Sequence, residues 1–353
     1  MSARLLTTAD AAEWEQALPA SRSAFGSLGF ARAQERMGLA NPRLLVAMIG
    51  EAAVAYPLSL RSLDDLPFAA AASGRWDSAS PPFTGPIASG GDLSRPERLN
   101  PSLGALAEQV AAVLSEEGVV SEFAHLHPWS SAPDVVGGGE ADREVVWVDA
   151  TLDPEELWRS SYSKACRKNV RRSEREGVGV RAAEGPDDIA EFHRIYEQTM
   201  VRSKAQASYF FDLGYFEAIH EEMPDAARFA LAEVDGKVIA ATLYMHDADD
   251  VYSYLGGADH AFQELRPTNA VVHATIAWAR EEGKRRLILG GGYRPGDGIF
   301  RFKASFSPKR VTLRLARRVL RPDDYEALVE AWARHHGGAS PTGFFPAYRD
   351  GRD

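Results

Sequence analysis

The fold is decided by one stretch in the second half of the chain, Val234-Asp235-Gly236-Lys237-Val238-Ile239-Ala240-Ala241-Thr242-Leu243. An Asp-Gly pair between apolar, β-branched runs is typical of the two-residue turn of a β-hairpin. A similar pattern lies 185 residues earlier, in Ile49-Gly50-Glu51-Ala52-Ala53-Val54-Ala55-Tyr56-Pro57-Leu58. Each hairpin follows a helical pattern and precedes further short strands and a helix. We therefore predict one mixed α/β unit used twice. The alternative is two unrelated α/β domains that each contain a hairpin.

Length and composition agree with two globular domains. The chain has 353 residues, of which 45% are hydrophobic and 25% charged, so disordered and fibrous classes are excluded. No apolar run approaches the roughly 20 residues of a membrane span, and the N-terminus lacks the apolar region of a signal peptide. The single cysteine, Cys166, excludes an internal disulfide and a thiolate metal site. We expect a cytoplasmic protein without an integral membrane segment.

Turn and capping signals predict where the domains divide. Residues 1–151 form the first domain and residues 152–318 the second, which opens on the helix start Asp153-Pro154. The second domain is predicted to contain helices at 154–176, 186–202, 208–222 and 269–283 and strands at 228–234, 237–246, 251–255 and 285–290. An apolar stripe at Tyr325, Leu328, Val329 and Trp332 has helical spacing. We expect this helix, with the tail in 319–353, to pack back on the first domain.

The net charge of −10 opposes a nucleic-acid partner, but the charges are unevenly placed. Six basic residues and no acid lie between Arg159 and Arg172, and nine basic residues against one acid lie between Arg294 and Arg321. The rest of the chain is correspondingly more acidic. We interpret the protein as an acidic body with two cationic patches.

The first patch has helical spacing. The step from one basic residue to the next alternates between three and one positions, which places all of them on one helix face. They are Lys164, Arg167, Lys168, Arg171, Arg172 and Arg175. Either an anion meets this face, or it is solvated and balanced by neighbouring acids such as Glu155 and Glu174.

A glycine run and a lysine form the second candidate site. Strand residues Leu287 to Leu289 lead into Gly290, Gly291 and Gly292, and Phe302-Lys303 follows. Glycines let backbone N–H groups approach a ligand, and a lysine can stabilise an oxyanion during acyl transfer. As a pattern this is weak, because such a lysine is often structural. We find neither a nucleophile elbow nor a zinc-binding His-Glu-x-x-His, and Cys166 is interpreted as a small core residue.

Several segments together resemble the Fem family of peptidoglycan aminoacyltransferases. The longest runs from Tyr162-Ser163-Lys164-Ala165-Cys166-Arg167-Lys168-Asn169 to Val178, and it resembles the start of the second domain in that family. The others are Trp76 to Ile87, Ala277 to Gly283, Leu289 to Gly292 and Phe302-Lys303-Ala304-Ser305-Phe306. The resemblance covers about residues 73 to 310, in order. It implies two tandem acyltransferase domains of the GNAT type and an enzyme of the acyltransferase class.

The resemblance also implies roles for particular residues. Lys303 stabilises the tetrahedral intermediate and Phe302 positions the reacting groups. Substrate-binding residues are Gly290, Gly291, Gly292, Asp77 and Tyr254, although Tyr254 and its aromatic neighbours either line a pocket or fill the core. From the two cationic patches we expect the phosphates of a tRNA to be bound by Lys164, Arg167, Lys168, Arg171, Arg172, Arg301, Lys309 and Arg310. No metal and no resident cofactor are expected.

The donor and the acceptor are left open by the residues themselves. In the Fem family an aminoacyl-tRNA donates its amino acid to an amine. The family's helical arm has no room in 177–228, so the acceptor is either a cell-wall precursor peptide or a small amine metabolite. An acyl-CoA donor is the alternative, but the turn Gln263 to Asn269 lacks the glycines of a pyrophosphate cradle and contains Pro267. A non-catalytic module that binds nucleic acid or protein is the third possibility.

Overall fold

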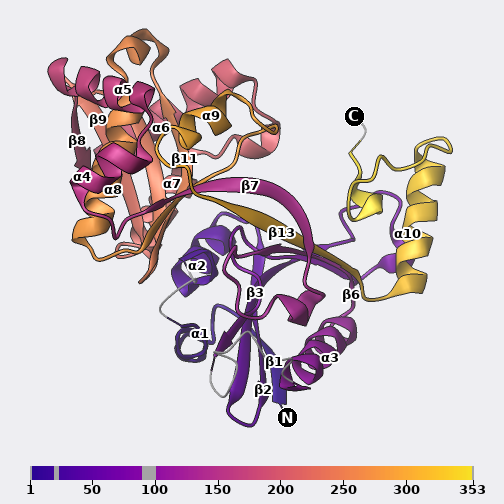
Figure 1. Ribbon diagram of the computed structural model, residues 1–353. Coiled ribbons are helices and arrows are strands. Elements are labelled where there is room, and N and C mark those ends of the chain that lie inside the picture. The colour runs from indigo at the N-terminus through magenta and orange to yellow at the C-terminus, as the bar shows by residue number, and fades with distance from the viewer. Residues whose placement is uncertain (1, 20–23, 90–100, 352–353) are drawn as a thin grey trace. The chain divides into compact units, whose positions relative to one another are not determined.

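The computed structural model describes residues 2–19, 24–89 and 101–351 (Figure 1). The chain divides into two compact units. Unit 1 comprises Met1–Pro19, Phe25–Asp142 and Leu313–Asp353, and unit 2 comprises Ala20–Ala24 and Arg143–Thr312. The chain passes between the units within strands β7 (Glu140–Asp149) and β13 (Arg310–Val319). The units meet at 142/143 and 312/313, whereas the predicted boundaries are 151/152 and 318/319.

Both units have the same order of elements. Unit 1 contains β1 (Ser2–Leu6), α1 (Ala11–Ala17), α2 (Leu28–Arg36), β2 (Asn41–Ile49), β3 (Ala52–Ser62), β4 (Trp76–Ala79), α3 (Pro101–Glu116) and β6 (Val119–Leu126), with β5 (Ile87–Ser89) paired to β3. Unit 2 contains β8 (Gly179–Ala182), α6 (Pro186–Ser203), α7 (Leu213–Glu222), β9 (Ala227–Val234), β10 (Lys237–His246), β11 (Asp250–Ala258), α8 (Pro267–Glu281) and β12 (Arg286–Gly290). The predicted duplication is confirmed in this shared order.

Strand pairing repeats as well. The two quoted hairpins are the antiparallel pairs β2–β3 and β9–β10. In each unit three antiparallel pairs are followed by one parallel pair, β4–β6 in unit 1 and β11–β12 in unit 2. The last strand of each sheet comes from the connection between the units, since β13 pairs with β6 and β7 pairs with β12. The mixed sheets flanked by helices confirm the predicted fold class.

Helices cover both faces of the sheet in unit 2. Ala230 and Ala232 of β9 belong to a core cluster with buried residues of α8 and of α5 (Lys164–Arg175). The neighbouring Phe229 points to the other face, where its ring lies 4.9 Å from that of Phe192 in α6. The helix that carries the cationic run thus packs on α8, and α6 lies across the sheet (Figure 1).

Two local departures from the predicted elements matter for function. The helix predicted at 154–176 is three pieces, namely α4 (Pro154–Glu156), the π-helical turn η5 (Leu157–Ser161) and α5. Ser163 starts α5 because its side chain accepts a hydrogen bond from the Cys166 N–H. A further short helix, α9 (Gly298–Ala304), contains Phe302 and Lys303 and was not predicted.

The C-terminal helix α10 (Pro322–His335) lies in unit 1. Its Leu328 and Trp332 are buried in a cluster with Val120 of β6 and with Tyr348 of the tail. Among residues 2–19, 24–89 and 101–351, no helix is both long and apolar enough to cross a bilayer.

Candidate active site

An opening in the sheet of unit 2 begins where β11 and β12 part. Their parallel pairing extends from Asp250 and Arg286 only to Tyr252 and Ile288, whereas β11 stays paired with β10 as far as Ala258. The register of β11 shifts between Ser253 and Leu255, so Tyr254 is the extra residue of a β-bulge. Beyond Tyr252 and Ile288, β11 and β12 are therefore no longer paired with each other in the part of the chain that the structure describes. A ligand can approach the edge of β11 there.

The glycine run closes the other side of this opening. Gly290 ends β12 with φ at +80°, a conformation that favours glycine. A Cβ at Gly292 would lie 2.3 Å from the Asp297 carboxylate, and one at Gly291 would lie 3.0 Å from the Glu144 carbonyl oxygen. The glycines were predicted to give a ligand access to the backbone. The structure adds another reason for them, which is that the chain itself folds tightly here.

Asp297 organises this tight turn. One carboxylate oxygen accepts a hydrogen bond from the Phe300 N–H at 2.7 Å and caps α9, and the other accepts from Tyr293 and Arg294 at 2.7 and 2.9 Å. These bonds, with that from Phe300 the largest, lower the pKa of Asp297. The carboxylate therefore stays ionised and fixes α9 against the end of β12.

Lys303 lies beside the glycine turn. Its Nζ donates a hydrogen bond to the Gly291 carbonyl oxygen at 2.8 Å and lies 3.2 Å from where a Cβ of Gly290 would be. Burial lowers the pKa of Lys303 to about 8, opposed by the charge of Asp297. An ammonium has three donors, so this arrangement leaves N–H groups for a substrate oxygen. Phe302 packs against the core cluster, and its ring contacts that of Phe306 at 5.4 Å.

We expect acyl transfer to fall as the pH rises through about 8, because only the protonated Lys303 stabilises an oxyanion. Below that pH the group is charged and the rate is governed by other groups. A pH profile of kcat for the wild type and for Lys303→Arg checks this, since a guanidinium keeps its proton throughout the range. If both proteins lose activity in parallel above pH 8, another group causes the fall.

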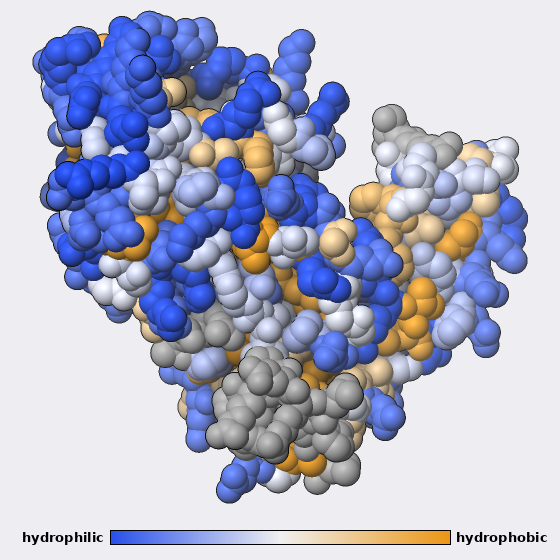
Figure 2. All heavy atoms as spheres, viewed as in Figure 1, coloured by the Kyte–Doolittle hydropathy of each residue, from blue (hydrophilic) through white to orange (hydrophobic). Residues whose placement is uncertain are grey.

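Only part of the cationic run of α5 faces solvent. Cys166, Val170 and Ser173 are buried, and burial raises the pKa of Cys166 to about 11, which is unfavourable for a nucleophile. The exposed residues form a line that we call the α5 stripe, consisting of Lys164, Lys168, Arg171 and Arg175. Figure 2 shows a predominantly hydrophilic surface over this part of unit 2.

Two residues predicted to bind phosphate are engaged within the protein. Arg167 donates hydrogen bonds to the carbonyl oxygens of Trp158 and Tyr162 and so holds the end of η5. Arg172 lies 3.3 Å from the carboxylate of Glu264. Both residues have these partners and are only partly exposed, so we leave them out of the α5 stripe, in which the exposed Arg175 also pairs with Glu176 at 3.1 Å.

Several residues of the second cationic window have partners within the protein. Lys309 pairs with Asp149 at 2.7 Å and lies over the ring of Trp147, and Arg310 donates to the Ser307 and Lys309 carbonyl oxygens. Arg301 donates to the Gly296 carbonyl oxygen at 2.7 Å but remains exposed. Further along β13 the arginines belong to unit 1, where Arg318 pairs with the buried Glu122. A sum of charges along the sequence misses acidic partners such as Asp149 and Glu122, which lie on strands other than β13.

The two other predicted substrate-binding residues, Asp77 and Tyr254, belong to different units. Asp77 belongs to unit 1, is fully buried, and forms ion pairs with Arg61 and Arg349. Its carboxylate therefore holds together its own unit, and we omit it from the site. Tyr254 is at the bulge of β11, and its hydroxyl lies 3.0 Å from that of Tyr215.

Sequence reasoning missed the pair formed by Tyr162 and His273. The phenol oxygen lies 2.9 Å from the Nδ1 of His273 in α8. Burial lowers the pKa of His273, so the imidazole is neutral near pH 7. In the sequence, the indication of the Tyr162–His273 pair is a single histidine within the apolar pattern of α8. Within the described ranges, no three His, Cys, Asp or Glu side chains gather as a metal site.

The class of protein follows from this geometry and from a family match. Residues 160–304, which contain the parting strands and Lys303, match the acetyltransferase (GNAT) domain family. This part of unit 2 is therefore a GNAT-type acyltransferase domain.

Solved structures extend the likeness to both units. The chain is similar to FemX, with a TM-score of 0.69 and 13% identity over 92% of this chain and 99% of that one. It also resembles the C-terminal domain of a putative lysylphosphatidylglycerol synthetase from Agrobacterium fabrum, with a TM-score of 0.55 and 16% identity over 94% and 98% of the two chains. A tandem GNAT protein from the clavulanic acid biosynthesis pathway gives 0.50 and 12% over 90% and 98%.

At these identities the likeness is one of fold. By sequence, no curated protein matches this chain. The predicted resemblance to Fem-like acyltransferases of the GNAT type is confirmed in the fold of the chain and, for residues 160–304, in the family match.

Proposed function

We propose that this protein transfers an aminoacyl group from aminoacyl-tRNA to an amine and forms an amide. The observation that carries the proposal is the contrast between two surfaces of unit 2. The start of α8, where GNAT enzymes hold the pyrophosphate of CoA, is poorly suited to an anion, whereas the α5 stripe presents four exposed cations.

The start of α8 offers few donors for a pyrophosphate. Arg266 precedes the helix with φ at +59°, and Pro267 at the first helical position has no N–H. The N–H of Asn269 is already bonded to the Arg266 carbonyl oxygen at 3.0 Å. The Glu264 carboxylate lies 3.3 Å from Arg172 and 3.5 Å from Arg266, so an acid occupies the place beside these cations. A second anion there would meet repulsion.

The chemistry requires little beyond orientation and charge stabilisation. The acceptor nitrogen attacks the ester carbonyl carbon, the C–N bond forms, and the carbonyl oxygen takes up negative charge. The bond between the carbonyl carbon and the ribose oxygen then breaks, and the departing ribose oxygen receives the proton that the amine loses. Lys303, held by Gly291, supplies the positive charge beside the developing oxyanion. Because the ester is already activated, no covalent enzyme intermediate is needed.

The acceptor is an amine carried by a peptide or by a small metabolite. The relevant opening lies between β11 and β12, with Tyr254 at its bulge. The amine can attack the ester only as the neutral base, because a protonated amine has no free electron pair.

The decisive experiment offers the protein a pool of tRNAs charged with labelled amino acids and, separately, a series of labelled acyl-CoAs, each with a mixture of peptide and small-molecule amines. We expect label to move into amide from the tRNA pool only, and prior RNase treatment to abolish this. Transfer from acyl-CoA that RNase leaves unchanged would establish the CoA-dependent alternative instead.

Neutralising two lysines of the α5 stripe is expected to weaken tRNA binding. The double variant Lys164→Gln/Lys168→Gln removes two exposed charges that face away from the buried side of α5. Affinity should fall roughly tenfold or more in dilute salt, and the slope of log K against log salt should decrease by about one per lysine. Titrations at several salt concentrations measure both quantities.

The control is Arg334→Gln, which removes one exposed positive charge from α10 in unit 1. It should leave affinity and slope nearly unchanged. If the control and the double variant behave alike, the α5 stripe is a solvated face without a specific partner.

A further inference from the structure

A small pocket adjoins the α5 stripe and has no role in the chemistry described above. It has a volume of about 50 Å³ and is lined by Leu157 and Trp158 of η5, by Tyr162, and by His273, Ile276 and Arg280 of α8. All of these residues belong to unit 2. The pocket would hold a few waters or receive part of one planar ring.

Three aromatic rings form one part of the pocket wall, beside apolar residues such as Leu157 and Ile276 and the charged Arg280. The Trp158 ring lies 5.6 Å from that of Tyr162 and 6.0 Å from that of His273, at angles of 49° and 61°. The Tyr162 and His273 rings meet edge to face at 5.7 Å. Rings at several inclinations offer both faces and edges to an inserted ring, as in sites that bind unstacked bases.

The pocket also contains a polar group suited to a base. Burial raises the pKa of Tyr162 and lowers that of His273, so both are neutral near pH 7 and neither adds a charge that an entering ring would have to desolvate. When the phenol donates to Nδ1, the proton of the imidazole is on Nε2, and it can be donated to an oxygen or nitrogen of a base.

Arg171 links the pocket to the α5 stripe. Its guanidinium lies over the Trp158 ring, 5.2 Å from the centroid, and Lys164, Lys168 and Arg175 continue along the same exposed side of α5. A nucleic-acid backbone along α5 therefore passes the pocket, with a cation directly at the tryptophan.

We infer that this pocket receives one unstacked base of the RNA whose phosphates lie along the α5 stripe. The inference rests on the proposed use of tRNA and adds a base-binding site to it. A coenzyme would bring a single base, attached to its phosphates, to the start of α8. The pocket instead includes the later turns of that helix, at Ile276 and Arg280, beside a line of cations that suits a longer chain.

The test uses the full protein and an RNA hairpin that mimics a tRNA acceptor stem with its unpaired 3′ end. Each unpaired nucleotide is replaced in turn by an abasic one, and binding is followed by fluorescence anisotropy. We expect one abasic position to weaken binding to the wild type about tenfold, within the range for loss of one stacked base. The other positions should matter less, and the salt slope should stay the same because no phosphate is lost.

Variants locate the effect in the pocket. Trp158→Leu keeps an apolar wall but removes the ring, and His273→Gln keeps a donor of similar reach. In Trp158→Leu we expect the intact and the sensitive abasic RNA to bind equally, both about tenfold more weakly than the intact RNA binds the wild type. Trp278→Leu, on another surface of α8 under Arg228, is the matched control and should retain the preference for the intact RNA.

The outcomes separate this inference from the proposed function. If the wild type binds the RNA in a salt-dependent manner but no abasic position matters, the pocket inference is wrong and the α5 stripe still binds phosphates. The same conclusion follows if Trp158→Leu keeps the abasic preference. If the wild type does not bind the RNA at all, both are wrong. The comparison of RNAs on the wild type is valid even if a variant fails to fold.

Discussion

Lys303→Met is expected to fold normally and to transfer acyl groups about 100- to 1000-fold more slowly than the wild type, the usual cost of removing one oxyanion donor. Methionine fills a similar volume, but it supplies neither positive charge nor an N–H. The loss should appear in kcat, because the Nζ acts on the charge that develops in the transition state. Single-turnover rates with saturating donor and acceptor measure it directly.

Stability should change in the opposite direction. The pKa of Lys303 is lowered by burial, so the unfolded chain binds more protons than the folded one between about pH 8 and the ordinary lysine range. The wild type therefore gains stability from this group as the pH rises through that interval. Lys303→Met lacks the buried ammonium, so at pH 7 it should be at least as stable. A variant that unfolds would contradict this placement of the side chain.

The control for turnover is Lys309→Met, six residues further along the chain. Lys309 pairs with Asp149 and contacts Trp147, away from the glycine turn. We expect it to retain most of its turnover. Wild-type rates in Lys303→Met would instead favour the non-catalytic binding module.

The hairpins were predictable because their turns are local. Asp235 and Gly236 have φ of +49° and +73°, the left-handed conformations that a two-residue turn requires, and the Asp-Gly pair is suited to both. The stripe on α10 was likewise readable, because helical spacing alone brings Leu328 and Trp332 to one side. Such features need no knowledge of the rest of the chain.

Helix α9 was missed because its local signals are weak. It has seven residues and begins with glycine, and it is fixed by the Asp297 cap and by packing of Phe302 on the core. Propensity over so short a segment decides little. The sequence pattern placed the glycine run and Lys303 in one candidate site, whereas the burial that lowers the pKa of Lys303 follows only from the tertiary structure.

Several cations of the charge analysis have partners that are far away in the sequence. Arg318 lies opposite Glu122 in the register of β13 and β6, although 196 residues separate the two in sequence. Asp77, which the family resemblance gives as a substrate-binding residue, forms ion pairs in the core with Arg61 and Arg349. The α5 stripe is different because the residues near it in sequence belong to the same helix. On α5 the local pattern identifies the exposed cations, although Arg172 pairs with Glu264 outside the helix, whereas on β13 the partner of Arg318 lies on a neighbouring strand.

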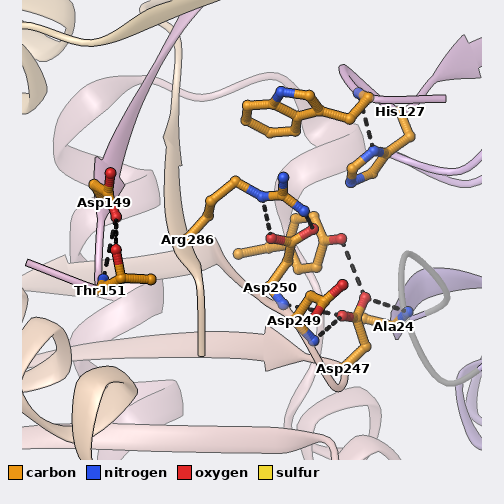
Figure 3. Close-up of polar contacts among 10 residues, drawn as sticks. Ala24, His127, Asp149, Thr151, Asp247, Asp249, Asp250 and Arg286 are labelled. Carbon is orange, nitrogen blue, oxygen red and sulfur yellow. Dashed lines mark hydrogen bonds and ion pairs between the residues drawn. The ribbon is translucent and has the colours of Figure 1, made fainter. Parts of the chain in front are cut away.

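The largest expected loss of stability comes from Asp250→Ala. Asp250 is fully buried and binds Arg286 through two hydrogen bonds of 2.5 and 2.9 Å, at the first pair of the parallel strands β11 and β12 (Figure 3). Removing the carboxylate leaves a guanidinium desolvated without its counter-ion. The free energy of unfolding should fall by about 3–5 kcal/mol, measured by chemical denaturation.

A double variant distinguishes the loss of stability caused by removing one partner from the net contribution of the Asp250–Arg286 ion pair to the free energy of unfolding. In Asp250→Leu/Arg286→Met both charges are replaced by apolar groups, and most of the lost stability should return, because a buried ion pair contributes little net free energy over packed side chains. Breaking the exposed pair between Glu330 and Arg334 with Glu330→Ala should cost under about 1 kcal/mol. A loss in Asp250→Ala no larger than this would mean that water reaches Arg286 and that the start of β11 and β12 is held by backbone pairing alone.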